Sequence, residues 1–224
     1  MTLEATLAEH KIFDSLDPTQ IKIAARAAIH KSYNNGAWIT HHGKVWPYLF
    51  LVKQGKVQAV KESPEGRSLL VAEFREKDVF WGIGFFLEDA PMPVALVAKE
   101  DAELYLWRVD DLKPTILKNG PLSWELVCLM IQRMQFASNM LDDFAFQPTT
   151  GRLAGVLLEH FQEAVDEYVA RDMTLDEMAA RIGSTREMVC RHLYQFADQG
   201  VIQINRTELK ILDQTVLKDL AGKD

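Results

Sequence analysis

The chain has 224 residues, a formal net charge of −7 at pH 7 and two cysteines. This length allows one large domain or two modest domains with ample core. Two thiolates are too few for an iron–sulfur cluster or zinc site built from cysteine alone, so we expect no metal. No apolar run approaches the roughly 20 residues that cross a membrane, and no secretory signal is evident. We therefore expect a cytoplasmic protein without membrane contact.

The N-terminal half predicts helices followed by a β-rich domain. Residues 3–29 have helical character, and Asp17-Pro18 fits a helix start because proline is favoured in the first turn. From about Tyr33 to Trp107, turn signals such as Asn34-Asn35-Gly36 separate short β-rich runs. The runs are residues 48–52, 57–60, 69–74, 94–98 and 104–107. Short strands at this spacing indicate a sandwich or barrel.

A long helix is predicted over residues 121–144, with two apolar stripes. One stripe has the alternating spacing of 3 and 4 that is typical of a coiled-coil seam. This dimer seam consists of Val127, Met130, Met134, Ala137, Leu141 and Phe144. The second stripe, interrupted only by Arg133, consists of Leu122, Leu126, Leu129, Phe136 and Met140. We expect the seam to pair with a second copy and the other stripe to cover the β-domain; a helix buried within one chain is the alternative.

Residues 147–151, Gln-Pro-Thr-Thr-Gly, break the long helix and are interpreted as a hinge. An amphipathic helix over residues 152–168 is expected to follow. Residues 174–201 then predict two short helices around a tight turn. Thr174 and Glu177 have the spacing of a capping box, Gly183 suits the turn, and Ser184 or Thr185 can cap the second helix. Their apolar positions are Leu175, Met178, Ala179, Ile182, Val189, Leu193 and Phe196. An ordinary helical hairpin is the alternative to a helix-turn-helix.

The start of the second helix carries side chains that can read DNA bases. Arg186, Glu187 and Arg191 lie near one face, at the end of a recognition helix that enters the major groove. Arginine can pair with guanine through two hydrogen bonds, and glutamate can accept one from cytosine. Residues 201–205 and 209–212 predict a hairpin, or wing, whose turn holds Arg206 for a phosphate contact. The predicted DNA-binding residues are Arg186, Glu187, Arg191, Thr185, Ser184, Thr174 and Arg206.

This order of elements resembles the cyclic-AMP receptor / fumarate–nitrate regulator (CRP/FNR) family of transcription factors. The resemblance covers nearly the whole chain. Its most specific parts are residues 182–191 (Ile-Gly-Ser-Thr-Arg-Glu-Met-Val-Cys-Arg), residues 146–152, and the β-domain residues Asn35-Gly36, Gly43, Gly55 and Asp78-Val79-Phe80.

The resemblance implies an α+β fold in three parts. A cyclic-nucleotide-binding-like β-roll, or double-stranded β-helix, with N-terminal helices would span residues 1–118. A dimerisation helix would span residues 119–146, and a winged helix-turn-helix residues 147–224. Family members bind palindromic promoter sites as homodimers and contact RNA polymerase. Arg186, Glu187 and Arg191 match the base-reading positions of the cyclic-AMP receptor branch, which implies GTGA-like half-sites.

The chain departs from the family where nucleotide-binding members hold their ligand. Gly82 stands at the position of the ribose-binding Glu, Met92 at that of the phosphate-binding Arg, and Pro93 at that of its Ser neighbour. Ala137-Ser138 lacks the Thr of the base-contacting pair. Because a buried phosphate without a counter-charge is costly, we expect no cyclic AMP binding.

An apolar effector pocket is the alternative use of this region. The candidate residues are Trp81, Gly82, Phe85, Phe86, Met92, Pro93, Ala137 and Ser138. They either pack as core or surround a small hydrophobic effector or haem, although no motif selects haem ligands. The cysteine cluster of the oxygen-sensing branch is absent.

The leading functional hypothesis is a dimeric transcription regulator that binds double-stranded DNA. Residues 174–210 carry five cations and five anions, so attraction to DNA must come from where the charges lie. This neutral balance also keeps open a ligand-binding module whose winged helix contacts protein. We expect no enzyme, because no nucleophile–base arrangement or phosphate loop is present. The sequence does not determine the effector, the target genes, or whether the protein activates or represses.

Overall fold

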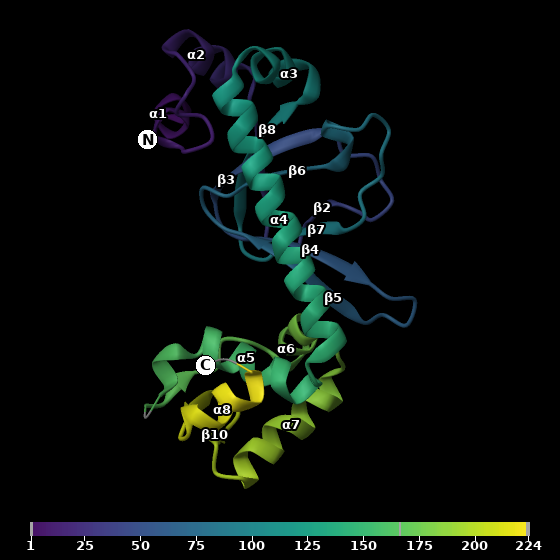
Figure 1. Ribbon diagram of the computed structural model, residues 1–224, viewed down its shortest axis with the longest axis vertical. Coiled ribbons are helices and arrows are strands. Elements are labelled where there is room, and N and C mark those ends of the chain that lie inside the picture. The colour runs from purple at the N-terminus through teal and green to yellow at the C-terminus, as the bar shows by residue number, and fades with distance from the viewer. Residues whose placement is uncertain (1, 166, 223–224) are drawn as a thin grey trace. The chain divides into compact units, whose positions relative to one another are not determined.

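The computed structural model describes residues 2–165 and 167–222, which divide into two compact units. The N-terminal unit comprises Met1–Lys61 and Val71–Phe136, and the C-terminal unit comprises Glu62–Leu70 and Ala137–Asp224. Helix α4 (Gly120–Phe146) contributes to both units (Figure 1). Among the residues that the structure describes, no helix combines the length and apolar character needed to cross a bilayer.

Three helices lie together at one end of the N-terminal unit (Figure 1): α1 (Leu3–Glu9), α2 (Pro18–Ala27) and α3 (Val109–Lys118). Helix α2 begins at Pro18 as predicted, because Asp17 and Gln20 form a capping box. The predicted helix to residue 29 is too long, since Ile29 already pairs with Leu106 in a sheet. Helix α3 was missed, and its internal Pro114 argues against helix at the sequence level.

The β-domain consists of two four-stranded antiparallel sheets, with strand orders β1-β8-β3-β6 and β2-β7-β4-β5. The strands are β1 (Ile29–Tyr33), β2 (Trp38–Thr40), β3 (Tyr48–Gln54), β4 (Val57–Glu62), β5 (Ser68–Phe74), β6 (Val79–Trp81), β7 (Ala95–Ala98) and β8 (Ala102–Arg108). The predicted runs all fall in strands, apart from Val94, which precedes β7. A short 3₁₀ helix, η1 (Ile83–Phe85), follows β6. This arrangement confirms the β-roll.

Alternation along β3 places the N-terminal unit's two apolar clusters on opposite faces of one sheet. Phe50 and Val52 join the cluster shared with the second sheet, whereas Leu49 and Leu51 join the cluster covered by helices. In the helix-covered cluster, Trp107 is fully buried and its indole N–H donates to the Ala24 carbonyl at 2.7 Å. The helices and sheets are thereby fixed to each other.

Helix α4 extends slightly beyond the predicted 121–144, and its second stripe behaves as expected over its first half. Leu122 and Leu126 are buried in the helix-covered cluster, and Leu129 packs against it. Arg133 interrupts the stripe by placing its guanidinium over the Phe74 ring, 5.1 Å from the centroid. Phe136 is half exposed.

In its described residues, the C-terminal unit contains four further α-helices and a small sheet. The helices are α5 (Thr149–His160), α6 (Leu175–Ile182), α7 (Arg186–Asp198) and α8 (Gln214–Ala221). The antiparallel sheet has the order β10-β11-β9, formed by β9 (Val169–Ala170), β10 (Ile202–Ile204) and β11 (Glu208–Ile211). The predicted hairpin of the wing is confirmed as β10 and β11. Helix α8 and the two-residue β9 were missed.

Two boundaries in this unit differ from the expectation. The break after α4 comprises only Gln147 and Pro148, since residues 149–151 already belong to α5. The helix predicted over residues 152–168 ends at His160, and a 3₁₀ turn, η2 (Gln162–Ala164), follows. Phe161 and Ala164 are buried in the unit's core. Tertiary packing therefore determines the backbone here, where helical periodicity had predicted a longer helix.

Candidate nucleic-acid interface

The turn between α6 and α7 is built by local polar contacts. The Thr174 hydroxyl accepts from the Glu177 amide at 3.2 Å, while a Glu177 carboxylate oxygen accepts from the Thr174 amide at 2.8 Å. Gly183 ends α6 in the left-handed conformation, with φ of +61°. Thr185, rather than Ser184, caps α7 by accepting from the Met188 amide at 3.3 Å. The predicted helix-turn-helix is therefore confirmed, caps included.

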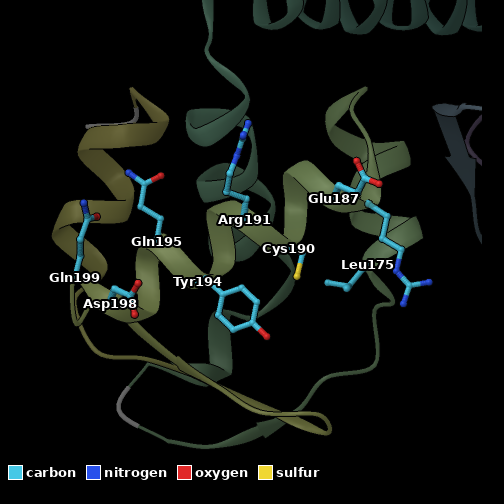
Figure 2. A pocket seen from close by; sticks show the side chains of 9 residues that line it. Leu175, Glu187, Cys190, Arg191, Tyr194, Gln195, Asp198 and Gln199 are labelled. Carbon is cyan, nitrogen blue, oxygen red and sulfur yellow. The ribbon is translucent and has the colours of Figure 1, made fainter.

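The buried side of α7 determines which of its residues face solvent. Val189, Leu193 and Phe196 are all buried in the core of the C-terminal unit. The opposite side lines a concavity of about 1000 Å³. Its lining residues are Leu175, Arg186, Glu187, Cys190, Arg191, Tyr194, Gln195, Asp198 and Gln199. Figure 2 shows Glu187, Arg191 and Gln195, which are spaced by four residues, projecting to the same side of α7.

The three predicted base-reading side chains are all exposed. Arg186 forms a weak ion pair with Asp176, in which its Nη1 atom lies 3.6 Å from a carboxylate oxygen. Exposed pairs of this kind contribute about 0–1 kcal/mol, so Arg186 can exchange Asp176 for a base at little cost. Arg191 contacts the Met188 sulfur. Guanidinium and carboxylate groups at the start of one exposed helix are suited to reading base edges in the major groove.

The wing adds a second cationic group to this surface. The Asn205 side-chain oxygen accepts from the amides of Thr207 and Glu208, at 2.9 and 2.8 Å, and so shapes the turn that exposes Arg206. A smaller concavity of about 300 Å³ is lined by α7 and wing residues together with Arg171. Arginines beside an exposed helix can bind phosphates on either side of a groove.

Sequence reasoning missed Arg171, Tyr194, Gln195 and Gln199 on this surface. The last three follow from the periodicity of α7 once its buried stripe is known. Arg171 carries no such signal. It reaches the wing because β9 pairs with β11, and its own amide donates to the Thr207 carbonyl at 2.7 Å.

The candidate effector residues do not share one apolar cluster. Trp81 and Phe85 pack in the helix-covered cluster, whereas Met92 is buried in the cluster between the sheets. Phe86 and Pro93 are exposed, as are Ala137 and Ser138 on α4. Among the described residues, no group of three or more His, Cys, Asp or Glu side chains is arranged to hold a metal ion.

Gly82 is the most constrained of these candidate residues. A Cβ atom added there would lie 1.8 Å from the Trp46 carbonyl oxygen, so the backbone would have to move. The position where nucleotide-binding relatives are expected to carry Glu thus has no room for a side chain in this structure.

Two family models match the chain in the order of its two units. The cyclic nucleotide-binding domain matches residues 30–119, and the Crp-like helix-turn-helix domain matches residues 151–220. A CRP-like cAMP-activated global transcriptional regulator of Mycobacterium tuberculosis is 24% identical, with 94% of this chain and 96% of that protein covered. The cyclic AMP receptor protein of Thermus thermophilus is 26% identical over the same shares.

Solved structures agree on the fold. A putative transcriptional regulator of the CRP/FNR family from Eubacterium rectale has a TM-score of 0.77 at 22% identity, covering 95% of this chain and 98% of that one. The c-di-GMP responsive global regulator CLP of Xanthomonas campestris has a TM-score of 0.75 at 18% identity, covering 87% and 99%.

A β-roll, a long helix and an exposed recognition helix define the class of DNA-binding transcription regulators. Within that class, the two family models, the relatives and the solved structures together support a regulator of the CRP/FNR type.

Proposed function

We propose that this regulator binds palindromic promoter sites with GTGA-like half-sites as a homodimer. The observation that carries the proposal is the exposed group Arg186, Glu187 and Arg191 on a fully packed helix-turn-helix. Two arginines can each take a guanine, and the glutamate can accept from a cytosine amino group. These are the contacts that a half-site rich in G·C pairs at fixed positions requires.

Homodimerisation is supported by the dimer seam of α4. Val127, Met130, Met134 and Leu141 are 42–69% exposed, although each is a large apolar side chain. Trp124 and Ile131 widen this surface. A contiguous apolar stripe with heptad spacing is typical of a helix that pairs with a second copy. Phe144 differs from the rest of the seam, because the Arg152 guanidinium lies 4.9 Å from its ring centroid.

We further propose contact with RNA polymerase and an effector other than a cyclic nucleotide. Regulation of transcription by the cAMP-activated relatives supports the first proposal by analogy. The second is supported by the lack of space at Gly82, by buried Met92 and by exposed Pro93, none of which supplies a phosphate or ribose partner. A small apolar molecule or haem remains the proposed alternative, and absorption and mass spectra of the purified protein would reveal either.

A second candidate function is a ligand-binding module whose winged helix contacts protein. The balance of five cations and five anions over residues 174–210 favours it, because nucleic-acid-binding surfaces are usually basic. The exposed arginines argue for DNA, since their side chains gather on α7 and beside the wing.

Selection of duplexes from a random-sequence library by the purified protein tests the proposal. We expect enrichment of palindromes with GTGA-like half-sites about one helical turn apart, roughly 34 Å. Recovery of sequences without two-fold symmetry or base preference would contradict the proposal and favour the protein-contact module. Arg191→Ala, which leaves the buried face of α7 intact, serves as the variant that should lose enrichment.

A further inference from the structure

Residues 147–152, Gln-Pro-Thr-Thr-Gly-Arg, comprise the break after α4 and the first four residues of α5. Residues 147–151 of this segment were interpreted above as a hinge. In the structure, three polar side chains of this segment are each bonded to a different helix of the helix-turn-helix domain. Gln147 bonds to α8, Thr149 to α7 and Arg152 to α6. All of these residues belong to the C-terminal unit.

Arg152 makes the most extensive set of contacts. Its Nε atom donates to the Ile182 carbonyl at the end of α6, at 2.9 Å. Its Nη1 atom donates to the carbonyls of Gln147, at 2.7 Å, and Asp143, at 3.3 Å. Carbonyls at helix C-termini carry partial negative charge, so one guanidinium interacts favourably with the end of α6 and with the chain at the end of α4. The guanidinium also lies over the Phe144 ring, 4.9 Å from its centroid.

Thr149 makes the connection to the recognition helix. Its hydroxyl lies 3.0 Å from the Nε2 atom of His192, which is buried on the inner side of α7. The Nδ1 atom of His192 is buried without a hydrogen-bond partner. Burial lowers the pKa of His192, which favours the neutral ring. Thr149 therefore supplies this imidazole with a polar contact from outside α7.

Gln147 and Gly151 bring α8 against the same segment. The side-chain amide of Gln147 donates to the Ala221 carbonyl at 3.1 Å. A Cβ atom on Gly151 would lie 2.5 Å from the Leu220 carbonyl oxygen, so α5 and α8 approach at a distance that only glycine permits. The segment is thus held by contacts to α6, α7 and α8 rather than left free to bend.

We propose that Gln147, Thr149 and Arg152 are positioning residues that form a rigid junction, fixing the recognition helix relative to the end of α4. This inference rests on the proposed function. In a dimer joined through α4, the separation of the two α7 helices depends on how each is held to its own α4. The junction therefore determines which half-site spacing the dimer accepts. Adding one base pair shifts a half-site by about 3.4 Å and about 34°, which a rigid junction cannot follow.

The test measures binding of the full-length protein to palindromes whose half-sites are moved apart or together by one base pair at a time. Fluorescence anisotropy gives the affinity for each duplex and for a duplex with a single half-site. We expect the wild type to prefer one spacing by about tenfold or more, and Arg152→Gln to reduce that preference to about twofold. Arg152→Lys should not restore it, because an ammonium cannot bridge carbonyls on two helices as the planar guanidinium does.

Two comparisons make the outcome specific. Thr149→Val, which removes only the hydroxyl contact, should reduce the spacing preference partly, whereas Lys218→Gln, an exposed charge on α8, should leave it unchanged. Affinity of Arg152→Gln for the single half-site should stay within about twofold of the wild type, because the base-reading face is untouched.

The proposal of a rigid junction is overturned if Arg152→Gln keeps the full spacing preference. It is equally overturned if the variant loses the single half-site, because Arg152 would then support α7 itself. Lack of sequence preference in the wild type would instead refute the proposed function, so the two failures are distinguishable.

Discussion

Five arginines of the C-terminal unit lie in three different surroundings that their residue type alone does not reveal. Arg186 and Arg191 lie on the exposed face of α7, Arg171 and Arg206 lie beside the wing, and Arg152 is partly buried between helix ends. Under the proposed function, the first pair reads base edges, because both arginines lie on the exposed face of the helix that would enter a major groove. The second pair is placed for phosphates, which carry no sequence information.

This division predicts different consequences for two substitutions. Arg186→Ala should cost about 1–3 kcal/mol on the preferred site and relax the preference at one base position. Arg171→Gln should weaken binding to all sequences about equally and reduce the slope of log affinity against log salt by about 1. Anisotropy titrations on matched and mismatched duplexes over a salt series measure both quantities. Uniform weakening by Arg186→Ala would refute base reading by this residue.

At this scale, sequence reasoning succeeded wherever a local rule applied. Thr174, Glu177, Gly183 and Thr185 were assigned from capping and turn chemistry, which acts within a few residues. Arg171 could not be assigned, because its place depends on pairing between β9 and β11 across about 40 residues.

Helix α4 is the element on which the proposed homodimer depends. Its second stripe begins with buried Leu122 and Leu126, whereas its dimer seam leaves Met134 and Leu141 more than 60% exposed. The two stripes thus differ in what covers them within one chain. Periodicity predicted both stripes, and the structure shows which of them stays exposed within one chain.

A carboxylate placed in the seam should abolish dimerisation. In Leu141→Asp, two like charges would face each other across the two-fold axis in an apolar surface, so we expect a monomer at micromolar concentration. Sedimentation velocity measures the state, and circular dichroism should be unchanged because Leu141 is exposed within one chain. Asn139→Asp, which adds the same charge at an exposed outer position, should remain dimeric. A dimeric Leu141→Asp protein would rule out this seam.

Element boundaries were the weakest part of the sequence-based reasoning. Helix α3 was obscured by Pro114, and α5 was extended past His160 into residues that form a 3₁₀ turn and an isolated β-bridge between Val165 and Ile211. In both places a long-range contact, rather than local periodicity, determines the backbone. The expected hinge is likewise shorter than its composition suggested, because α5 begins directly after Pro148.

At the scale of the whole molecule, the two units relate differently to the family pattern. The C-terminal unit retains the exposed arginines and glutamate expected of a DNA-reading helix. The N-terminal unit retains the β-roll but places Gly82 where a side chain would meet the Trp46 carbonyl. The fold can therefore be kept while the ligand-binding residues change. The alternation of apolar residues that forms the sheets does not depend on which residues occupy the ligand-binding positions.

This difference predicts that cyclic AMP does not bind. Calorimetric titration of the full-length protein should give no binding heat at micromolar concentrations, because no arginine stands at the phosphate position and no glutamate at the ribose position. The same titration with DNA carrying the selected palindrome serves as the positive control for folded protein. Micromolar binding of cyclic AMP would contradict this prediction and show that a residue at another position neutralises the phosphate.

The sequence by itself determined the order of elements, the two helices and caps of the DNA-binding motif, and the two apolar stripes of α4, because periodicity and capping are local. Only the tertiary structure decided that residues 147–152 are fastened to three helices, that Arg171 joins the wing, and that Gly82 has no room for a side chain. These features depend on atoms that are distant in sequence and meet only when the core packs. Rules that relate neighbouring residues cannot predict such long-range contacts.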